Sequence, residues 1–180
     1  MRHSERGQAE VVLLCGIAGS GKTTYAKDLE TRGYVRLSVD EEIWDRFGRY
    51  GVDYEPDEYE RHTRVAREAV RERMLSLIAE GRDVVVDSSF WQRSLRQEYK
   101  QLIERAGGRW RLVYLRADPE LLRGRLRVRA ARFDANAAFP ITEELFAHYL
   151  DSFEPPSGEG EEIVPVSDHV PALPGAEADR

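Results

Sequence analysis

Short runs of apolar residues alternate along the chain with longer segments in which apolar residues recur at helical spacing. The apolar runs predict five strands, over residues 10–16, 34–40, 83–87, 110–117 and 161–167. The helical spacing predicts six helices, over residues 21–33, 40–48, 57–81, 92–108, 118–133 and 142–153. This alternation is typical of an α/β domain with a mainly parallel sheet and helices on both faces.

Several residues mark where the predicted elements begin and end. Gly81 ends the predicted long helix, as expected of a glycine that terminates a helix. Asp118 with Pro119 predicts a capped helix start, and Thr142 opens the helix after it. Pro165 cannot donate a ladder hydrogen bond, so the last strand is predicted to lie at an edge of the sheet.

The length of 180 residues and a hydrophobic content of 41% are sufficient for one domain with its own core. We predict a single domain over residues 1–167. The segment 168–180 is rich in proline and small residues and is predicted to be a flexible tail.

Charge and cysteine content narrow the class of protein. The net charge of −6 lacks the basic excess that is typical of proteins dedicated to long nucleic acids. The single cysteine, Cys15, lies in an apolar run and is expected to be a buried thiol, which leaves no internal disulfide or cysteine-based metal cluster. The polar start and the absence of a run of membrane-spanning length favour a cytoplasmic protein with no membrane partner.

The segment "CGIAGSGKTT", Cys15 to Thr24, carries the clearest chemistry. It satisfies the pattern G-x-x-x-x-G-K-[ST] between a predicted strand and a predicted helix, which is the context of a phosphate-binding loop. Backbone N–H groups and the positive end of the helix dipole would bind the phosphates, and the Thr23 hydroxyl would bind Mg²⁺. The residues predicted to bind nucleotide here are Gly16, Ala18, Gly19, Ser20, Gly21, Lys22, Thr23 and Thr24.

The loop alone is compatible with a kinase, with a nucleotide-driven switch or motor, and with a binding module that has no catalytic activity. The chain has one asparagine, Asn136, and Ala137 follows it, so the N-K-x-D guanine-binding motif is absent. Asp87 is followed by Ser88, where motor ATPases usually carry a glutamate that activates water. These features favour phosphoryl transfer to a hydroxyl.

Two carboxylates end predicted strands and would lie beside the phosphate loop, because ligands bind at the carboxyl ends of parallel strands. Asp40 is the candidate general base, and its alternative role is to cap the helix that begins at Glu41. Asp87 is the candidate metal ligand together with Thr23, or it orients the acceptor.

The segment "DPELLRGRLRVRAARF" is rich in arginine and predicts a lid over residues 123–141. Arg125 and Arg129 are four residues apart and share one helical face, where they would contact phosphate. Arg123, Arg127 and Arg132 lie on other faces, and a solvated arginine face is the alternative interpretation. The segment 135–139 is predicted to close over the site.

With these pieces the chain resembles the P-loop kinases related to polynucleotide kinase, chloramphenicol phosphotransferase and the zeta toxins. The matching segments are "GIAGSGKTT", the aspartate Asp40, "VVVDSSFW" and "RADPELLRGRLRVR". The resemblance implies a P-loop NTPase fold with strand order 2-3-1-4-5 and ATP with Mg²⁺ as the nucleotide and metal. It also implies Asp40 as general base and Arg125 and Arg129 as phosphate-binding lid residues.

The acceptor is expected to bind near residues 43–62 and 89–91. Relatives of polynucleotide kinase often place an arginine three residues after the base, and this chain has Ile43 there. The segment is aromatic and acidic, which favours a neutral or cationic hydroxyl compound, unless its acids only solvate a loop. A small metabolite or antibiotic is therefore the first expectation, a nucleic-acid 5′-hydroxyl the second and a nucleotide sugar the third.

Overall fold

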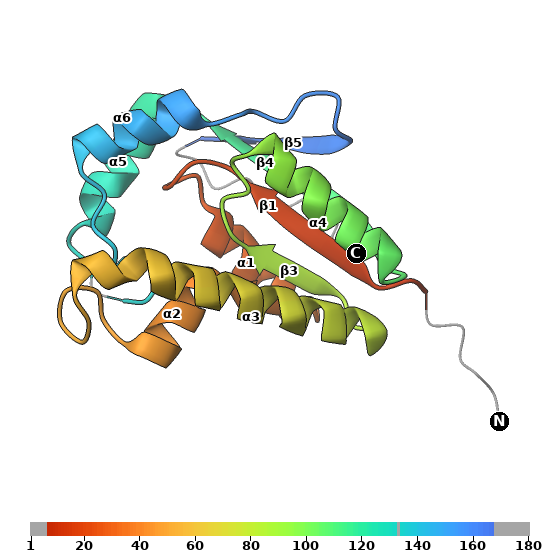
Figure 1. Cartoon of the computed structure of the whole chain (residues 1–180). Coiled ribbons are helices and arrows are strands. Elements are labelled where there is room, and N and C mark those ends of the chain that lie inside the picture. Colours follow the sequence, from red (N-terminus) through yellow and green to blue (C-terminus); the bar gives the residue numbers. More distant parts are fainter. Residues whose placement is uncertain (1–6, 133, 168–180) are drawn as a thin grey trace, which may run out of the picture.

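Five strands form one sheet in the computed structural model, which describes residues 7–132 and 134–167 (Figure 1). The predicted tail over 168–180 lies outside the described residues. The elements in chain order are β1 (Glu10–Cys15), α1 (Lys22–Thr31), β2 (Val35–Ser38), α2 (Val39–Phe47), a 3-10 turn (Pro56–Glu58), α3 (Tyr59–Ala79), β3 (Val84–Asp87), α4 (Arg93–Arg105), β4 (Arg109–Ala117), α5 (Pro119–Arg129), α6 (Glu143–Ser152) and β5 (Glu161–Val166).

The sheet has the strand order β2-β3-β1-β4-β5, and every pairing in it is parallel. This confirms the predicted α/β P-loop fold and its order. Strand β5, with Pro165, lies at an edge as predicted. Ser38 pairs with Asp87 at the ends of β2 and β3, so the loops after these strands open on the same side as the phosphate loop.

The two faces of β1 belong to two separate cores, which explains its uninterrupted apolar sequence. Val11, Leu13 and Cys15 pack under α3 and α4, together with residues such as Met74. Val12 packs on the opposite face against α1. Figure 1 shows α3 and α4 side by side on one face of the sheet and α1 on the other. Helices therefore cover both faces, as the alternation of elements predicted.

The start of α2 differs from the prediction. Strand β2 ends at Ser38, whose hydroxyl accepts a hydrogen bond from the Glu41 N–H at 3.3 Å and caps the helix. Asp40 therefore lies in the first turn of α2 and not at the end of a strand. The alternative role of Asp40 as helix cap is wrong, because Ser38 fills it.

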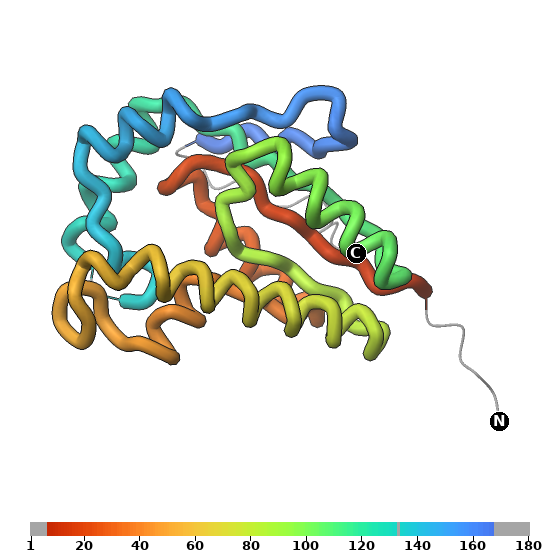
Figure 2. The backbone as a smooth tube through the Cα atoms, in the orientation of Figure 1, coloured from red at the N-terminus to blue at the C-terminus, as the bar shows by residue number. Residues whose placement is uncertain are grey.

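The other predicted caps are confirmed, and one helix is shorter than expected. Asp118 accepts from the Glu120 N–H at 2.8 Å, and Thr142 accepts from the Leu145 N–H at 3.2 Å. Helix α5 ends at Arg129, before the predicted end at residue 133. The chain then runs from α5 down to α2 and α3 before it returns to α6, as the tube in Figure 2 shows.

A buried ion pair fixes the loop that follows β3. Arg96 in α4 has no solvent exposure and donates to Glu159 at 2.6 and 2.9 Å. The same guanidinium donates to the Phe90 carbonyl at 2.9 Å, and the Cys15 thiol donates to that carbonyl at 3.3 Å. Phe90 has φ = 38°, an unfavourable conformation for a non-glycine residue. These contacts hold the strained loop in place at the open end of the sheet.

Replacing Glu159 with glutamine should destabilise the fold, because the Arg96 charge would remain buried without its partner. We expect a loss of about 3–5 kcal/mol in the free energy of unfolding, measured by urea denaturation. Glu162→Gln at the surface is the control and should stay within about 0.5 kcal/mol of the wild type.

The same pair predicts a pH dependence. Hydrogen bonds from Arg96 lower the pKa of Glu159 below its ordinary value of 4.5. Its stabilising contribution is therefore complete above pH 4.5 and is lost as the pH falls through the lower pKa of the folded state. A Glu159→Gln protein as stable as the wild type at neutral pH would contradict the role of this pair.

Candidate active site

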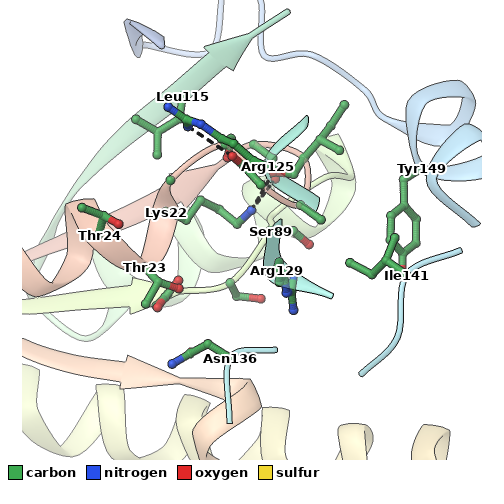
Figure 3. Close-up of a pocket in the computed structure, with 18 of the residues that line it drawn as sticks. Lys22, Thr23, Thr24, Ser89, Leu115, Arg125, Arg129, Asn136, Ile141 and Tyr149 are labelled. Carbon is green, nitrogen blue, oxygen red and sulfur yellow. Dashed lines mark hydrogen bonds between the residues drawn. The ribbon is translucent and has the colours of Figure 1, made fainter. Parts of the chain in front are cut away.

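A cleft of about 1320 Å³ opens at the carboxyl ends of the strands. The loop from Gly16 to Thr24 forms one wall, Asp40 and Asp87 line the cleft near it, and Arg125 and Arg129 reach it from α5. Every residue that the sequence predicted for nucleotide, metal or proton transfer thus lies in one cavity, and their chemical roles remain predictions. The close-up in Figure 3 shows Lys22, Thr23 and Arg129 in this cleft.

The glycines of the loop are required by its geometry. Gly19 and Gly21 have φ values of +87° and +94°, in the left-handed region that favours glycine. A Cβ atom on Gly16 would lie 2.5 Å from Ser20 Oγ and 3.1 Å from the Leu115 carbonyl. The loop therefore curls tightly, and Lys22 Nζ lies inside it, donating to the carbonyls of Gly16 and Ile17 at 2.9 and 3.0 Å.

The loop has donors that fit a polyphosphate. Helix α1 begins at Lys22 with no side-chain cap, so its first N–H groups are available to an anion. Ser20 Oγ and Arg129 Nε are buried and have no hydrogen-bond partner among the described residues. Buried donors without partners are costly, and phosphate oxygens would satisfy them.

The charges in the cleft perturb one another. Burial lowers the pKa of Lys22 to about 8, although Asp87 and Asp40 act in the opposite direction. Desolvation also raises the pKa of Asp40, and Arg129 partly offsets this. The Asp40 carboxylate is exposed on the cleft surface, yet protein atoms crowd around it, so it is accessible and still poorly solvated. Perturbed groups that converge in a cleft are typical of active sites.

Asp87 is buried and held by two neighbours that belong to different elements. Arg36 of β2 donates to it at 3.1 Å, and the Thr23 hydroxyl also hydrogen-bonds to it. Arg36 further pairs with Glu41 of α2, whose carboxylate accepts from Asn136 Nδ2 at 3.2 Å. Arg36 was not predicted from the sequence, because nothing in the local pattern distinguishes it from the other arginines. The contacts connect the phosphate loop, α2 and the segment after α5.

Thr23 and Asp87 could hold a magnesium ion, since hydroxyl and carboxylate oxygens suit that cation. Among the described residues there is no group of three or more His, Cys, Asp or Glu side chains that could hold a metal. The remaining ligands would therefore be phosphate oxygens and water, which is usual for Mg²⁺ in nucleotide sites.

The two predicted lid arginines differ in their contacts. Arg125 donates to the Gly19 carbonyl at 3.2 Å and to the Ser167 carbonyl at 3.1 Å, so it supports the phosphate loop. Arg129 points into the cleft (Figure 3) and acts electrostatically on Asp40 and on Tyr149 of α6. Of the two, Arg129 is therefore the more available for a phosphate.

The segment after α5 docks on α2 and α3. The Phe139 ring stacks on Tyr59, with centroids 4.4 Å apart, and meets Tyr50 at 5.1 Å. Asn136 adds the hydrogen bond to Glu41. The segment predicted as a lid therefore reaches from α5 to α2 and α3, and aromatic contacts anchor its far end.

The expected acidic lining near the acceptor is wrong. None of the five acids of the segment lines the cleft: Asp45, Asp53, Glu55, Asp57 and Glu58. Asp53 pairs with Arg49 at 2.8 Å, and Glu58 pairs with Arg61 at 2.6 Å. Glu55 and Glu58 also form the capping box of the 3-10 turn. These acids are used by local contacts at the surface, which was the alternative interpretation.

The aromatic residues of the same region divide between core and cleft. Phe90 is buried, and Phe47 stacks on His62 with ring centroids 3.8 Å apart. Tyr59 and Trp91 line the cleft. The lining on this side also includes Thr63 and Arg67 of α3.

Comparison with protein families gives one match, to the model described as an AAA domain, over residues 11–156. A search of the curated proteins gave no match. No helix in residues 7–132 and 134–167 is sufficiently long and apolar to cross a membrane.

Several solved structures share the fold. A proposed kinase from Chloroflexus aurantiacus j-10-fl is 18% identical, with a TM-score of 0.70 over 89% of this chain and 88% of its own. A gluconokinase from Sinorhizobium meliloti 1021 is 22% identical, with a TM-score of 0.59 over 90% and 85%. A chain of the Pnkp1/Rnl/Hen1 RNA repair complex is 18% identical, with a TM-score of 0.58 over 84% and 48%. The fold is thus that of P-loop kinases.

Lys22→Ala should weaken ATP binding about tenfold to a hundredfold, because a charged hydrogen-bond donor to phosphate is lost. In the wild type, affinity should also fall above about pH 8, where Lys22 loses its proton. Phosphate favours the charged lysine, so binding above that pH should take up protons. Calorimetry between pH 7 and 9.5 in two buffers of different ionisation enthalpy measures both effects. Equal affinity in a folded Lys22→Ala protein would contradict the role of the loop.

Phe139→Ala removes the ring that stacks on Tyr59 and should loosen the segment 134–141. Such a pair contributes about 0.5–1.5 kcal/mol, so amide exchange in this segment should be about 2- to 12-fold faster. Hydrogen exchange with mass spectrometry measures this. Val128→Ala, at an exposed position of α5, is the control and should leave exchange unchanged. Identical exchange in both variants would show that the aromatic contact does not anchor the segment.

Proposed function

Since this chain belongs to the AAA domain family, we propose that it is an ATP-dependent kinase that transfers the γ-phosphoryl group to a hydroxyl of a small molecule. The acceptor class that we propose is a hydroxylated metabolite or an antibiotic-like compound. Mg²⁺ would accompany the nucleotide, as is general in P-loop kinases.

One observation carries this proposal. The Asp40 side chain makes no hydrogen bond or ion pair with the described residues, and it lines the cleft within electrostatic reach of Lys22 and Arg129. Ser38 already caps α2, so beyond the favourable charge of Asp40 in the first turn of that helix no contact with the described residues explains this carboxylate. Its position between the phosphate loop and the rest of the cleft suits a general base for an incoming hydroxyl.

The side chains would divide the reaction as follows. The phosphate loop and Lys22 would bind and orient the phosphates, and Arg129 would stabilise charge on the moving phosphoryl group. Asp40 would orient the acceptor hydroxyl and accept its proton as the oxygen bonds to phosphorus and the bond to the β-phosphate oxygen breaks. When bound, Mg²⁺ would neutralise charge on the β- and γ-phosphates, held by Thr23 and Asp87.

The contacts around Asp87 argue against ATP hydrolysis as the main reaction. Asp87 is followed by Ser88, so the chain lacks a carboxylate at the position that activates water in motor ATPases. Asp87 itself is engaged by Arg36 and Thr23. Asp40 is then the free carboxylate beside the loop, and it lies where an acceptor would enter.

A small acceptor is favoured over a polynucleotide. Ile43, at the position where relatives of polynucleotide kinase often carry a phosphate-gripping arginine, is 4% exposed and packs in the core. The gluconokinase resembles this chain along nearly its whole length, whereas the RNA repair chain is about twice as long. The polynucleotide 5′-hydroxyl kinase remains the second candidate for the same cleft.

Asp40→Asn keeps the size of the side chain and removes its charge. ATP should bind with nearly normal affinity, while transfer to an acceptor should fall about 10²- to 10⁴-fold, as is typical of a lost general base. The raised pKa of Asp40 further predicts that wild-type kcat/KM declines on acidification at a pH above 3.8, the ordinary value for aspartate. Single-turnover transfer of labelled γ-phosphate to a panel of hydroxyl compounds measures the rates.

Asp45→Asn is the matched control, because Asp45 lies in the same helix, is exposed and is outside the cleft. It should transfer at the wild-type rate. Normal transfer by folded Asp40→Asn would exclude Asp40 as the base. ATP binding without transfer to any hydroxyl, by wild type as well as variant, would indicate a non-catalytic nucleotide-binding module.

A further inference from the structure

One face of α3 forms the wall of the cleft on the acceptor side. Tyr59, Thr63 and Arg67 are spaced four residues apart, so they lie in a row along the helix, and all three line the cleft. Trp91, from the loop after β3, also lines it. This row contains one charged side chain, that of Arg67.

Arg67 is exposed and, like Arg64, has no partner among the described residues, whereas the other three arginines of α3 are paired. Arg61 pairs with Glu58 at 2.6 Å, Arg71 with Glu98 at 3.2 Å and Arg73 with Glu80 at 3.2 Å. Arg67 forms no hydrogen bond or ion pair with residues 7–132 and 134–167. The α4 carboxylate of Glu98 is already engaged by Arg71. The cation of Arg67 is therefore free to bind an anion that enters the cleft.

The separation between Arg67 and Asp40 limits how far the anionic group of an acceptor can lie from its reacting hydroxyl. Tyr59 lies within electrostatic reach of Asp40, and Arg67 is two helical turns further on, a rise of about 12 Å. Arginine side chains on a helix lean back toward its N-terminus, which shortens this separation. Asp40 thus acts on Tyr59 at one end of the row, and Arg67 forms the other end.

The other lysines and arginines that line the cleft come from elements other than α3. Lys22 and Lys27 belong to α1 and Arg125 and Arg129 to α5, while Arg132, which follows α5, pairs with Asp134. The acids that could have neutralised the acceptor side face away from it, as Asp53 and Glu58 do. The acceptor side therefore carries an unpaired positive charge where a negative lining was expected from the sequence.

We propose that Arg67 binds a carboxylate or phosphate group on the acceptor, several bonds away from the hydroxyl that is phosphorylated. This inference rests on the proposed kinase function of the cleft. A guanidinium offers paired donors that match the oxygens of either group, and such charge-assisted bonds are among the stronger ones. Trp91 would pack on the body of the acceptor, and Arg67 would select acidic hydroxyl compounds over their neutral analogues.

The test uses hydroxyl compounds in matched pairs, each with an acidic and a neutral member. The pairs are an aldonate with its aldose, a sugar phosphate with the free sugar, and an oligonucleotide, whose first nucleotide carries a 3′-phosphate, with the free nucleoside. Wild type should transfer labelled phosphate to the acidic member of a pair with the higher kcat/KM. Arg67→Gln should reduce that preference about tenfold to a hundredfold, mainly through KM. Arg67→Lys should retain part of it.

Arg64→Gln is the matched control, since Arg64 lies one turn away in α3, has no partner among the described residues and does not line the cleft. It should keep the wild-type preference. An effect of Arg67→Gln that is equal for both members of every pair, or a preference for the neutral members, would overturn the proposal. Preference confined to the oligonucleotide would assign Arg67 to a nucleic-acid phosphate and overturn the small-molecule assignment.

Equilibrium binding separates the two proposals. Calorimetry on the Asp40→Asn protein, loaded with a non-hydrolysable ATP analogue and Mg²⁺, compares the same pairs without transfer. In one outcome the acidic members bind more tightly, Arg67→Gln abolishes this difference, and the wild type phosphorylates none of the compounds. That outcome would refute the kinase and support the anion site. Transfer to neutral members, with no discrimination in binding, would support the kinase and refute the anion site.

Discussion

The buried carboxylate of Asp87 is the point on which the arrangement of the cleft depends. A carboxylate that is largely excluded from solvent must be paired, and its partners come from the phosphate loop, through Thr23, and from β2, through Arg36. Arg36 also pairs with Glu41, and the Glu41 carboxylate accepts a hydrogen bond from Asn136. One requirement of charge burial thereby aligns the loop, the start of α2 and the segment that follows α5.

A second buried ion pair does the same for the other side of the cleft. Arg96 and Glu159 bring α4 against the chain that leads into β5, and the guanidinium also holds the Phe90 carbonyl. Ser88, Ser89 and Trp91 surround that strained residue and line the cleft. Two parts of the cleft are therefore each positioned by an arginine whose carboxylate partner lies far away in the sequence.

The features that could be predicted from the sequence are those that depend on residues close together in the chain. The uninterrupted apolar run of β1 identifies a strand buried on both faces, and the phosphate loop has a fixed spacing, whereas the strand order came from resemblance to a family. The start of α2 was predictable in principle, because Ser38 with Glu41 is a capping-box pattern. Asp53 and Arg49 are only four residues apart, so their pairing in the turn between α2 and the 3-10 turn is a local contact. Arg36–Asp87 and Arg96–Glu159 join residues 51 and 63 positions apart, and in an arginine-rich chain no local pattern identifies them.

The burial of Cys15 has a practical consequence for studies of motion. Its thiol lies inside the central strand, and burial raises its pKa to about 11, so the reactive thiolate is scarce at neutral pH. The chain contains no other cysteine. Alkylating dyes and spin labels should therefore not react with the Cys15 thiol. They should attach only to cysteines introduced at chosen surface positions. Pairs of labels on α3 and α5 could then report the separation of the two walls of the cleft without background from the wild-type chain.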